Sequence, residues 1–343
     1  ISFVVPNLFK KIKKSKNKNN ILKNLNHFRD FISIDDISDF NSLIDESISI
    51  KKNPFKYSHL GEKKAIGLIF FNKSLRTRLS MQKAAEMIGL KCFVMNFNNE
   101  GWNLEFENNA IMSTDKAEHI KEAAMVLSQY CDIIAIRKFP DLQNKDEDES
   151  EKILNSFIKY AEVPIVNLES STAHPLQALA DAITIREHKK NVKPKIVLSW
   201  APHPNPLPHA VANSFVKMVK RIDAEFVITN PVGYNLNSKI TDGVTVTHDQ
   251  NQAFKNADFI YAKNWSSYDE YGQVITKDKN WMIDNDLMSK TNDAYFMHCL
   301  PVRRNIVVAD DVLDSGKSIV IKQAQNRIYS SLVVLKRILE NEK

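Results

Sequence analysis

The chain contains a short apolar run, residues 65–71, that stops where hydroxyl and guanidinium side chains begin. A run of this length, rich in β-branched and aromatic residues, predicts a buried strand of a parallel sheet rather than a helix. A helix is predicted to follow, capped by Ser74 and ending at Gly89. A strand that leads into a helix N-terminus points free backbone N–H groups and the positive end of the helix dipole at one place. The sequence therefore predicts a dianion site at this junction.

Four polar residues gather at the predicted helix start: Ser74, Arg76, Thr77 and Arg78. Runs of charge usually lie on a solvated surface, and that is the alternative interpretation. Arginine at a helix N-terminus opposes the helix dipole, however, and costs a few tenths of a kcal/mol unless an anion is bound there. The anion-binding interpretation is therefore favoured.

Short apolar runs alternate with helix-like stretches along the body of the chain, which predicts parallel sheets with helices on both faces. The alternation forms two series, so we predict two doubly wound α/β domains, residues 28–180 and 181–322. A C-terminal helix, residues 323–343, is expected to pack back on the first domain. A ligand should lie between the domains, outside the carboxyl ends of the strands. The predicted strands are residues 65–71, 92–95, 133–136, 164–166, 196–200, 226–229, 259–262 and 295–298. The predicted helices are residues 117–130, 153–160, 177–190, 209–221 and 325–339, and the acidic run 141–151 is a surface loop or a helix start.

The formal charge of +6 is concentrated in the first residues of the sequence. Residues 1–27 contain seven lysines and no acid, which leaves a net charge of −1 for residues 28–343 once those lysines are subtracted. We predict a disordered basic tail and a body that does not bind nucleic acid, because no basic surface remains to follow a phosphate backbone. A nucleic-acid partner held by the tail alone is the alternative.

Cysteine, glycine and hydropathy patterns exclude several classes of protein. Cys92, Cys131 and Cys299 cannot all pair and lack the spacing of metal ligands, which favours a reducing cytoplasm and no metal. No segment has 18 uninterrupted apolar residues, so no membrane span is expected. The eight glycines form no dinucleotide or P-loop motif, and no nucleophile-elbow or zinc-protease motif occurs, so we expect no cofactor. The interpretation that remains is a site in which arginines bind phosphate beside a neutral histidine.

Polar side chains fall repeatedly just after predicted strands. A single histidine at such a place is more often structural. Six clusters on the same edge of two sheets nevertheless favour a shared site. The clusters are residues 74–78, Arg137, Glu169 with 174–177, His203, 263–265 and 298–304.

Three of these clusters resemble the signatures of one enzyme family. Residues 74–78 (SLRTR), 174–177 (HPLQ) and 298–301 (HCLP) are similar, in order and spacing, to the motifs of the aspartate/ornithine carbamoyltransferases. The similarity extends over about residues 28–343. It implies that the first domain binds carbamoyl phosphate, that the second binds an amino acid, and that a homotrimer shares active sites between subunits.

Departures from the family pattern indicate which branch of the family the chain resembles. Leu75 stands where Thr is common, Leu176 stands where a small residue or Cys is common, and the Ser-Met-Gly loop of the ornithine branch is absent. The absence of that loop fits an amino-acid substrate whose α-amine is acylated, because such an amine carries no charge and needs no anion in the protein. The α-carboxylate of the same substrate still needs a cation, and Lys263 can supply it. In the branch that acts on N-acetylornithine or N-succinylornithine, a proline-rich stretch like residues 201–208 is part of a knotted crossing of the chain. The residues that resemble this branch are Trp102, Glu169, His203, Lys263 and the pair Arg303-Arg304.

The resemblance implies direct transfer of the carbamoyl group to the δ-amine of an N-acylornithine, without a covalent intermediate. Holding two substrates in register can lower the barrier by several kcal/mol. The implied catalytic residues are Arg76, Thr77, Arg137 and His174. The residues implied for carbamoyl phosphate are Ser74, Leu75, Arg76, Thr77, Trp102 of a neighbouring subunit, Arg137, His174, Pro175, Leu176, Gln177, Cys299, Leu300, Arg303 and Arg327. Those implied for the acylornithine are Glu169, His203, Lys263, Cys299 and Leu300.

Three alternatives stay open. Cys299 beside His298 suggests a nucleophile, but adjacent residues on a strand point to opposite faces, which disfavours covalent catalysis. The position of Ala117 carries Glu in the acetyl-specific enzymes that it resembles and Pro in the succinyl-specific ones. Ala leaves room for the extra carboxylate that a Glu would repel, so N-succinylornithine is favoured. An ornithine carbamoyltransferase, or a non-catalytic protein that binds phosphometabolites, remains as another function.

Overall fold

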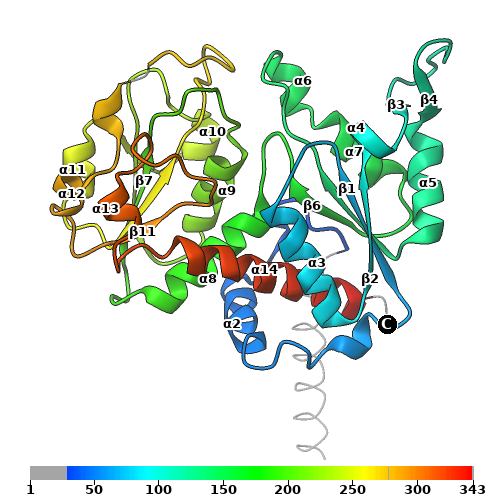
Figure 1. Cartoon of the computed structure of the whole chain (residues 1–343), viewed down its shortest axis with the longest axis horizontal. Helices are drawn as coiled ribbons and strands as arrows, with labels where there is room; N and C mark the ends of the chain where they lie inside the picture. Colours follow the sequence, from blue (N-terminus) through cyan, green and yellow to red (C-terminus); the bar gives the residue numbers. More distant parts are fainter. Residues whose placement is uncertain (1–28, 277, 342–343) are drawn as a thin grey trace, which may run out of the picture.

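The structure is a computed structural model that describes residues 29–276 and 278–341. The tail predicted at residues 1–27 lies outside the described residues. Two α/β units stand side by side, each built on a parallel sheet (Figure 1). The predicted fold class is therefore confirmed.

The first sheet has the strand order β2-β1-β5-β6, with all strands parallel. Side chains alternate between its two faces, because successive residues of a strand point in opposite directions. Ile66 and Leu68 pack with the core that reaches the long helices, whereas Ile69 packs under α5 and α7. The strands are β1 (Ala65–Phe70), β2 (Lys91–Asn96), β5 (Ile133–Arg137) and β6 (Ile165–Glu169). The helices of this unit are η1 (Ile34–Asp36), α2 (Phe40–Ile50), η2 (Ser58–Leu60), α3 (Arg76–Ile88), α4 (Phe97–Glu100), α5 (Ile120–Tyr130), α6 (Lys145–Glu149) and α7 (Lys152–Tyr160).

The second sheet has the order β11-β10-β7-β8-β9 and is also parallel throughout. Its central strand β7 is buried, with Leu198 facing the larger core and Val197 facing a smaller one under α11 and α12. The strands are β7 (Lys195–Trp200), β8 (Glu225–Thr229), β9 (Thr245–Thr247), β10 (Phe259–Lys263) and β11 (Tyr295–Met297). The helices are α9 (Ala210–Val219), α10 (Ser238–Thr241), α11 (Gln250–Phe254), η3 (Lys279–Trp281), α12 (Asn285–Met288) and α13 (Asp310–Leu313).

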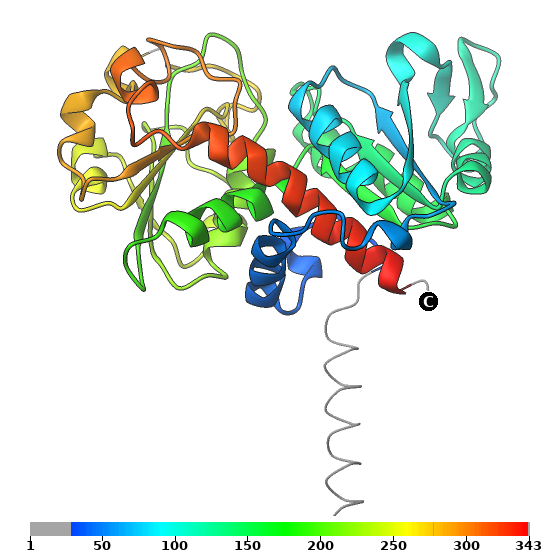
Figure 2. The same ribbon diagram turned by 60° about the horizontal axis from the view of Figure 1, so that its bottom comes forward.

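Two long helices, α8 (Pro175–His188) and α14 (Val320–Asn341), join the units. Figure 2 shows α14 running from one unit to the other. It packs against α3, α8 and α2, and its apolar stripe belongs to one core that spans both sheets. The last helix therefore fixes the first unit relative to the second.

Two local predictions were wrong, and one strand was missed. Helix α3 begins at Arg76 after Leu75, and no side chain in the described part of the chain caps it, so Ser74 is not the cap. Residues 116–119 form strand β4 (Lys116–His119), paired with β3 (Asn103–Glu105), and α5 starts only at Ile120. Pairing with β3 overrides the helix propensity of this segment. Strand β9 was not predicted, since its three residues form no apolar run.

Other predictions agree with the structure. Helix α3 ends where Gly89 adopts φ 89°, and a Cβ there would lie 2.1 Å from the Ser58 carbonyl oxygen, so the position needs glycine. Part of the acidic run 141–151 forms the short helix α6. The Leu207 carbonyl of the proline-rich stretch accepts from the Ser266 N–H at 3.0 Å, which joins this stretch to the chain after β10. A knotted crossing there stays a prediction. No helix within residues 29–276 and 278–341 is long and apolar enough to cross a membrane.

Candidate active site

A cavity of about 330 Å³ lies at the carboxyl ends of the strands of both sheets. Strand register explains why polar residues meet there: Phe70 pairs with Arg137, and Arg137 pairs with Glu169, so three strands end side by side. The predicted residues that line the cavity are Ser74, Leu75, Arg76, Thr77, Arg137, Glu169, His174, Gln177, His203, Lys263, Cys299, Leu300 and Arg327. The structure thus brings most of the predicted site residues into one space.

Arg137 organises the wall formed by the first unit. The residue is 6% exposed, and its guanidinium donates to the carbonyl oxygens of Asn72, at 3.3 Å, and Lys73, at 2.8 Å. The same guanidinium pairs with the Glu169 carboxylate at 3.1 Å. The segment between β1 and α3 is therefore tied to the end of β5.

The helix start of α3 meets a second arginine. Arg327 of α14 donates to the Thr77 hydroxyl at 2.6 Å, and both side chains are buried. Burial lowers the pKa of Arg327 to about 10, which leaves the guanidinium charged at neutral pH. The Nε atom of Arg76 is buried without a hydrogen-bond partner among the described residues. Three guanidiniums and one carboxylate leave this wall with an excess of positive charge, which suits an anion.

His174 precedes α8 and lies between the charged groups. Its Nε2 is 3.6 Å from a Glu169 carboxylate oxygen and 3.4 Å from the Arg327 guanidinium. Burial, and then the positive charges of Arg327, Arg137 and Lys263, hold the pKa of His174 well below its usual range. The imidazole is therefore neutral at physiological pH.

Glu169 has opposing influences on its charge. Burial raises the pKa of this carboxyl, whereas Arg137, Arg327 and Lys263 favour its ionised form. Because Arg137 makes two contacts with it, at 3.1 and 3.2 Å, the carboxylate has a direct counter-charge.

The second unit contributes a cation to the opposite wall. Lys263 ends β10, is 7% exposed, and donates to the Asn264 carbonyl at 2.9 Å. The segment after it is fixed, because Trp200 donates to the Trp265 carbonyl and Trp265 donates to the Tyr234 carbonyl. A lysine held in this way can meet a carboxylate on a ligand that spans the cavity.

Several predicted residues lie away from this cavity. Trp102 is 59% exposed and donates to Glu118 at 2.8 Å, and Ala117 is exposed on β4. Arg303 donates to His203 Nε2 at 3.0 Å but does not line the cavity. Pro175 begins α8, and the Leu176 side chain packs into the main core. Their predicted roles are not supported by contacts within a single chain.

Sequence reasoning did not assign His298 and Asn264, although both line the cavity. His298 Nδ1 accepts from the Leu300 N–H at 2.9 Å, which folds the loop after β11 back on itself. Both residues belong to polar clusters that follow predicted strands, so the position was a usable signal for them.

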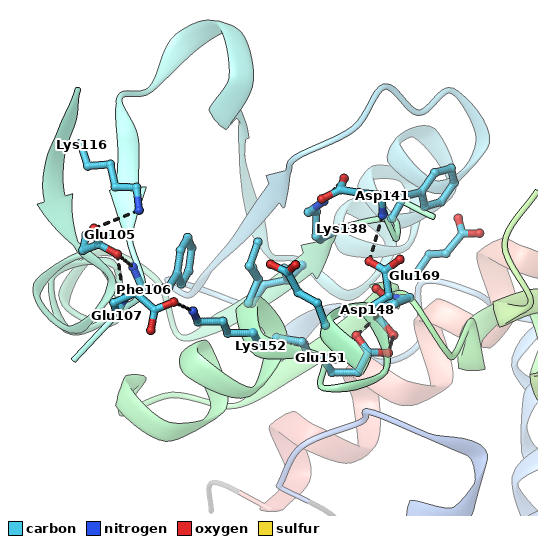
Figure 3. Close-up of a pocket in the computed structure, with 17 residues that line it drawn as sticks. Glu105, Phe106, Glu107, Lys116, Lys138, Asp141, Asp148, Glu151, Lys152 and Glu169 are labelled. Carbon is cyan, nitrogen blue, oxygen red and sulfur yellow. Dashed lines mark hydrogen bonds and ion pairs between the residues drawn. The ribbon is translucent and has the colours of Figure 1, made fainter. Parts of the chain in front are cut away.

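A second pocket, of about 230 Å³, is also lined by Glu169, which it shares with the cavity described above (Figure 3). Most of its carboxylates already have partners within the chain. Asp148 accepts from two backbone N–H groups, Glu105 pairs with Lys116 at 2.9 Å, and Glu107 pairs with Lys152. No group of His, Cys, Asp and Glu among the described residues could hold a metal ion. We interpret this pocket as support for the segment around Glu169.

Models of protein families match both halves of the chain. Residues 29–187 match the aspartate/ornithine carbamoyltransferase carbamoyl-P binding domain, and residues 208–338 match the Asp/Orn binding domain. The chain belongs to the aspartate/ornithine carbamoyltransferase family. The predicted family is therefore confirmed.

Members of this carbamoyltransferase family with curated names include two kinds of relative. An N-succinylornithine carbamoyltransferase of Bacteroides fragilis is 51% identical over 313 residues, which cover 91% of this chain and 98% of the relative. An N-acetylornithine carbamoyltransferase of Xylella fastidiosa is 34% identical and covers 87% and 94% of the two chains.

Solved structures of the family have the same fold. An N-acetyl-L-ornithine transcarbamylase complexed with acetylcitrulline matches with a TM-score of 0.86 at 32% identity, covering 91% of this chain and 99% of that chain. A variant of such an enzyme, complexed with carbamyl phosphate and N-succinyl-L-norvaline, matches with a TM-score of 0.85 at 32% identity over 91% of this chain and 100% of that chain.

Proposed function

We propose that this protein transfers the carbamoyl group of carbamoyl phosphate to the δ-amine of an N-acylated ornithine, with N-succinyl-L-ornithine favoured. The products are an N-acylcitrulline and phosphate, in arginine biosynthesis. One observation carries the proposal: the cavity sets three guanidiniums and a neutral imidazole opposite a buried lysine. The 51% identity to an N-succinylornithine carbamoyltransferase supports it.

The phosphate is assigned to the start of α3. Ser74, Arg76, Thr77 and the backbone N–H of Leu75 lie where the free N–H groups of the helix point, and no side chain among the described residues caps them. A phosphate bound there gains both the helix dipole and the guanidinium charge. We accordingly propose that residues 28–180 form the carbamoyl-phosphate domain and residues 181–322 the acylornithine domain.

The carbamoyl oxygen is assigned to Arg137, His174 and Thr77. Charge that develops on this oxygen in the transition state is stabilised by donors that are already in place. Arg137 is held by two carbonyl oxygens and Glu169, so it needs no reorganisation. Gln177 and the backbone carbonyls of the 299–300 loop accept from the carbamoyl NH₂. The departing phosphate takes the proton of the attacking amine.

The acylornithine is assigned to Glu169, His203 and Lys263. Lys263 meets the α-carboxylate, and the acylated α-amine carries no charge that would require a further carboxylate. Trp102 and Ala117 lie outside the cavity of their own chain, so we assign them to the site of a neighbouring subunit. Ala117 adds no negative charge beside the acyl group, which is compatible with the extra carboxylate of a succinyl group.

A homotrimer that shares its sites is supported by an exposed apolar face beside the cavity mouth. Edge strand β2, the neighbouring helix α3 and the β3–β4 arm carry large apolar side chains that no other part of residues 29–276 and 278–341 covers. Faces of this kind usually mark an interface. The exposed side chains are Leu75, Leu79, Phe93, Met95, Trp102, Ile111 and Met112. A mass in solution close to three chains is expected by light scattering, and a monodisperse monomer would contradict the shared site. The cytoplasmic location stays a prediction.

The activity is tested by incubating the purified protein with carbamoyl phosphate and each of three acceptors, and measuring the ureido product. We expect more ureido product from N-succinylornithine than from N-acetylornithine, and little from ornithine. Product with ornithine alone would establish an ornithine carbamoyltransferase. Binding of carbamoyl phosphate with no product from any acceptor would establish the non-catalytic alternative.

A further inference from the structure

A chain of buried amide groups runs behind the cavity, and its hydrogen-bond directions are forced. The His298 backbone N–H can only donate, and it donates to Gln323 Oε1 at 3.0 Å. The amide nitrogen of Gln323 must therefore point the other way, and it donates to Asp181 Oδ1 at 2.7 Å. Gln323 and Asp181 are completely buried.

Asp181 also fixes the orientation of the Gln177 amide. The two residues lie one turn apart on α8, and Gln177 Nε2 donates to the same Asp181 oxygen at 2.8 Å. The oxygen of the Gln177 amide is thereby turned away from Asp181. It is buried without a hydrogen-bond partner among the described residues, and Gln177 lines the cavity. Buried acceptors are normally hydrogen-bonded, and a ligand in the cavity can supply the donor to this one.

Asp181 has no structural need to be acidic. Its closest polar neighbours in the described chain are two neutral amides and the Tyr261 hydroxyl, which contacts it without full hydrogen-bond geometry. Most of the surrounding helix positions are apolar, with Leu179, Ala182 and Ile183 all buried. Arg327 acts on Asp181 only at a distance, and a carboxyl group buried without a cation in direct contact costs stability unless another role retains it.

We propose that Asp181 is a positioning residue that selects a carbamoyl donor over an acyl donor. By accepting from the Gln177 amide nitrogen, it keeps the Gln177 oxygen facing the cavity, where it accepts from the carbamoyl NH₂. A donor that carries a methyl group in place of NH₂ leaves that oxygen unpaired. The inference rests on the proposed function and adds a residue that does not itself touch the substrate.

The test uses two phosphonates that differ only in this group. Phosphonoacetamide carries the NH₂, and acetonylphosphonate carries a methyl group instead. We expect the wild-type protein to bind phosphonoacetamide about tenfold more tightly in calorimetry, as one hydrogen bond to a buried acceptor would give. Asp181→Leu removes the acceptor but keeps the branched shape, and should lower this ratio about threefold or more while the affinity for acetonylphosphonate stays unchanged.

Asp181→Asn is the matched control. It keeps an oxygen that can accept from both amides, so the ratio should stay close to that of the wild type. If Asp181→Leu does not fold, Asp181→Ala removes the same acceptor and carries the same expectation. Gln177→Met removes the terminal acceptor itself, and combining it with Asp181→Leu should lower the ratio no further than Gln177→Met alone.

Each other outcome overturns a defined claim. A wild type that binds both phosphonates equally, an unchanged ratio in Asp181→Leu, or equal weakening of both ligands overturns the positioning role. A ratio that falls as far in Asp181→Asn as in Asp181→Leu also overturns it, since the charge and not the direction of the amide would then matter. A wild-type protein that binds neither phosphonate contradicts the proposed function itself.

Discussion

The buried imidazole of His298 should make the stability of the protein depend on pH. Its Nδ1 accepts from the Leu300 N–H, so the loop after β11 requires a neutral ring. Burial, with the charges of Lys263 and Arg76, lowers the pKa of His298 to about 3. An exposed histidine in the unfolded chain has a pKa of about 6.5.

The sign of the effect follows from these two pKa values. Between about pH 6.5 and pH 3 the unfolded chain binds a proton at His298 that the folded chain does not bind. The contribution is therefore complete above pH 6.5 and is lost as the pH falls below it. Lowering the pH from about 7.5 to about 5.5 should cost about 1.4 kcal/mol of unfolding free energy from this residue alone.

Urea denaturation at both pH values measures the effect in the wild type and in His298→Asn, whose side chain can still accept from Leu300. The wild type should lose about 1.4 kcal/mol more than His298→Asn over this interval. His59→Asn changes an exposed histidine outside the cavity and should behave as the wild type does. Equal losses in the wild type and in His298→Asn would refute the argument.

Three further substitutions test the site. Ala117→Glu should lower kcat/KM for N-succinylornithine at least about tenfold relative to N-acetylornithine, because like charges a few ångströms apart repel by about 1–4 kcal/mol; unchanged preference in steady-state kinetics would remove Ala117 from the acyl subsite. Cys299→Ala should reduce the rate of product formation without abolishing it, since burial raises the pKa of this thiol and disfavours a thiolate nucleophile; complete loss in a folded variant would restore covalent catalysis. Arg137→Leu should lower the unfolding free energy by about 3–5 kcal/mol, because Glu169 is left buried and unpaired; a change under about 1 kcal/mol in urea denaturation would show that the pair does not stabilise the fold.

The strand-to-helix junctions are predictable from the sequence because both signals are local. An apolar run that ends at residue 71 and a polar cluster that follows it indicate a strand end whichever partner the strand has. Parallel pairing then aligns the ends, as the pairs Phe70 with Arg137 and Arg137 with Glu169 confirm. The general location of the candidate site is therefore implied before any contact is known.

The supporting contacts are not predictable in this way. Asp181 and Gln323 are 142 residues apart, and nothing in either segment indicates that α8 and α14 bring them together. Residues 117–119 have helix-favouring composition and lie next to a true helix, and only their pairing with β3 makes them a strand. The proposed assignment of Trp102 and Ala117 to the site requires a second chain, which one sequence does not reveal.

The central claim is that one cavity holds carbamoyl phosphate and an acylornithine together. A crystal structure with a bisubstrate phosphonate, in which a phosphonoacetyl group is joined to the δ-nitrogen of N-succinylornithine, tests it directly. We expect the phosphonate to contact Ser74, Arg76 and Thr77, the amide oxygen to contact Arg137 and His174, and the α-carboxylate to contact Lys263. Electron density for the analogue outside this cavity, or with its phosphonate remote from the start of α3, would contradict the account.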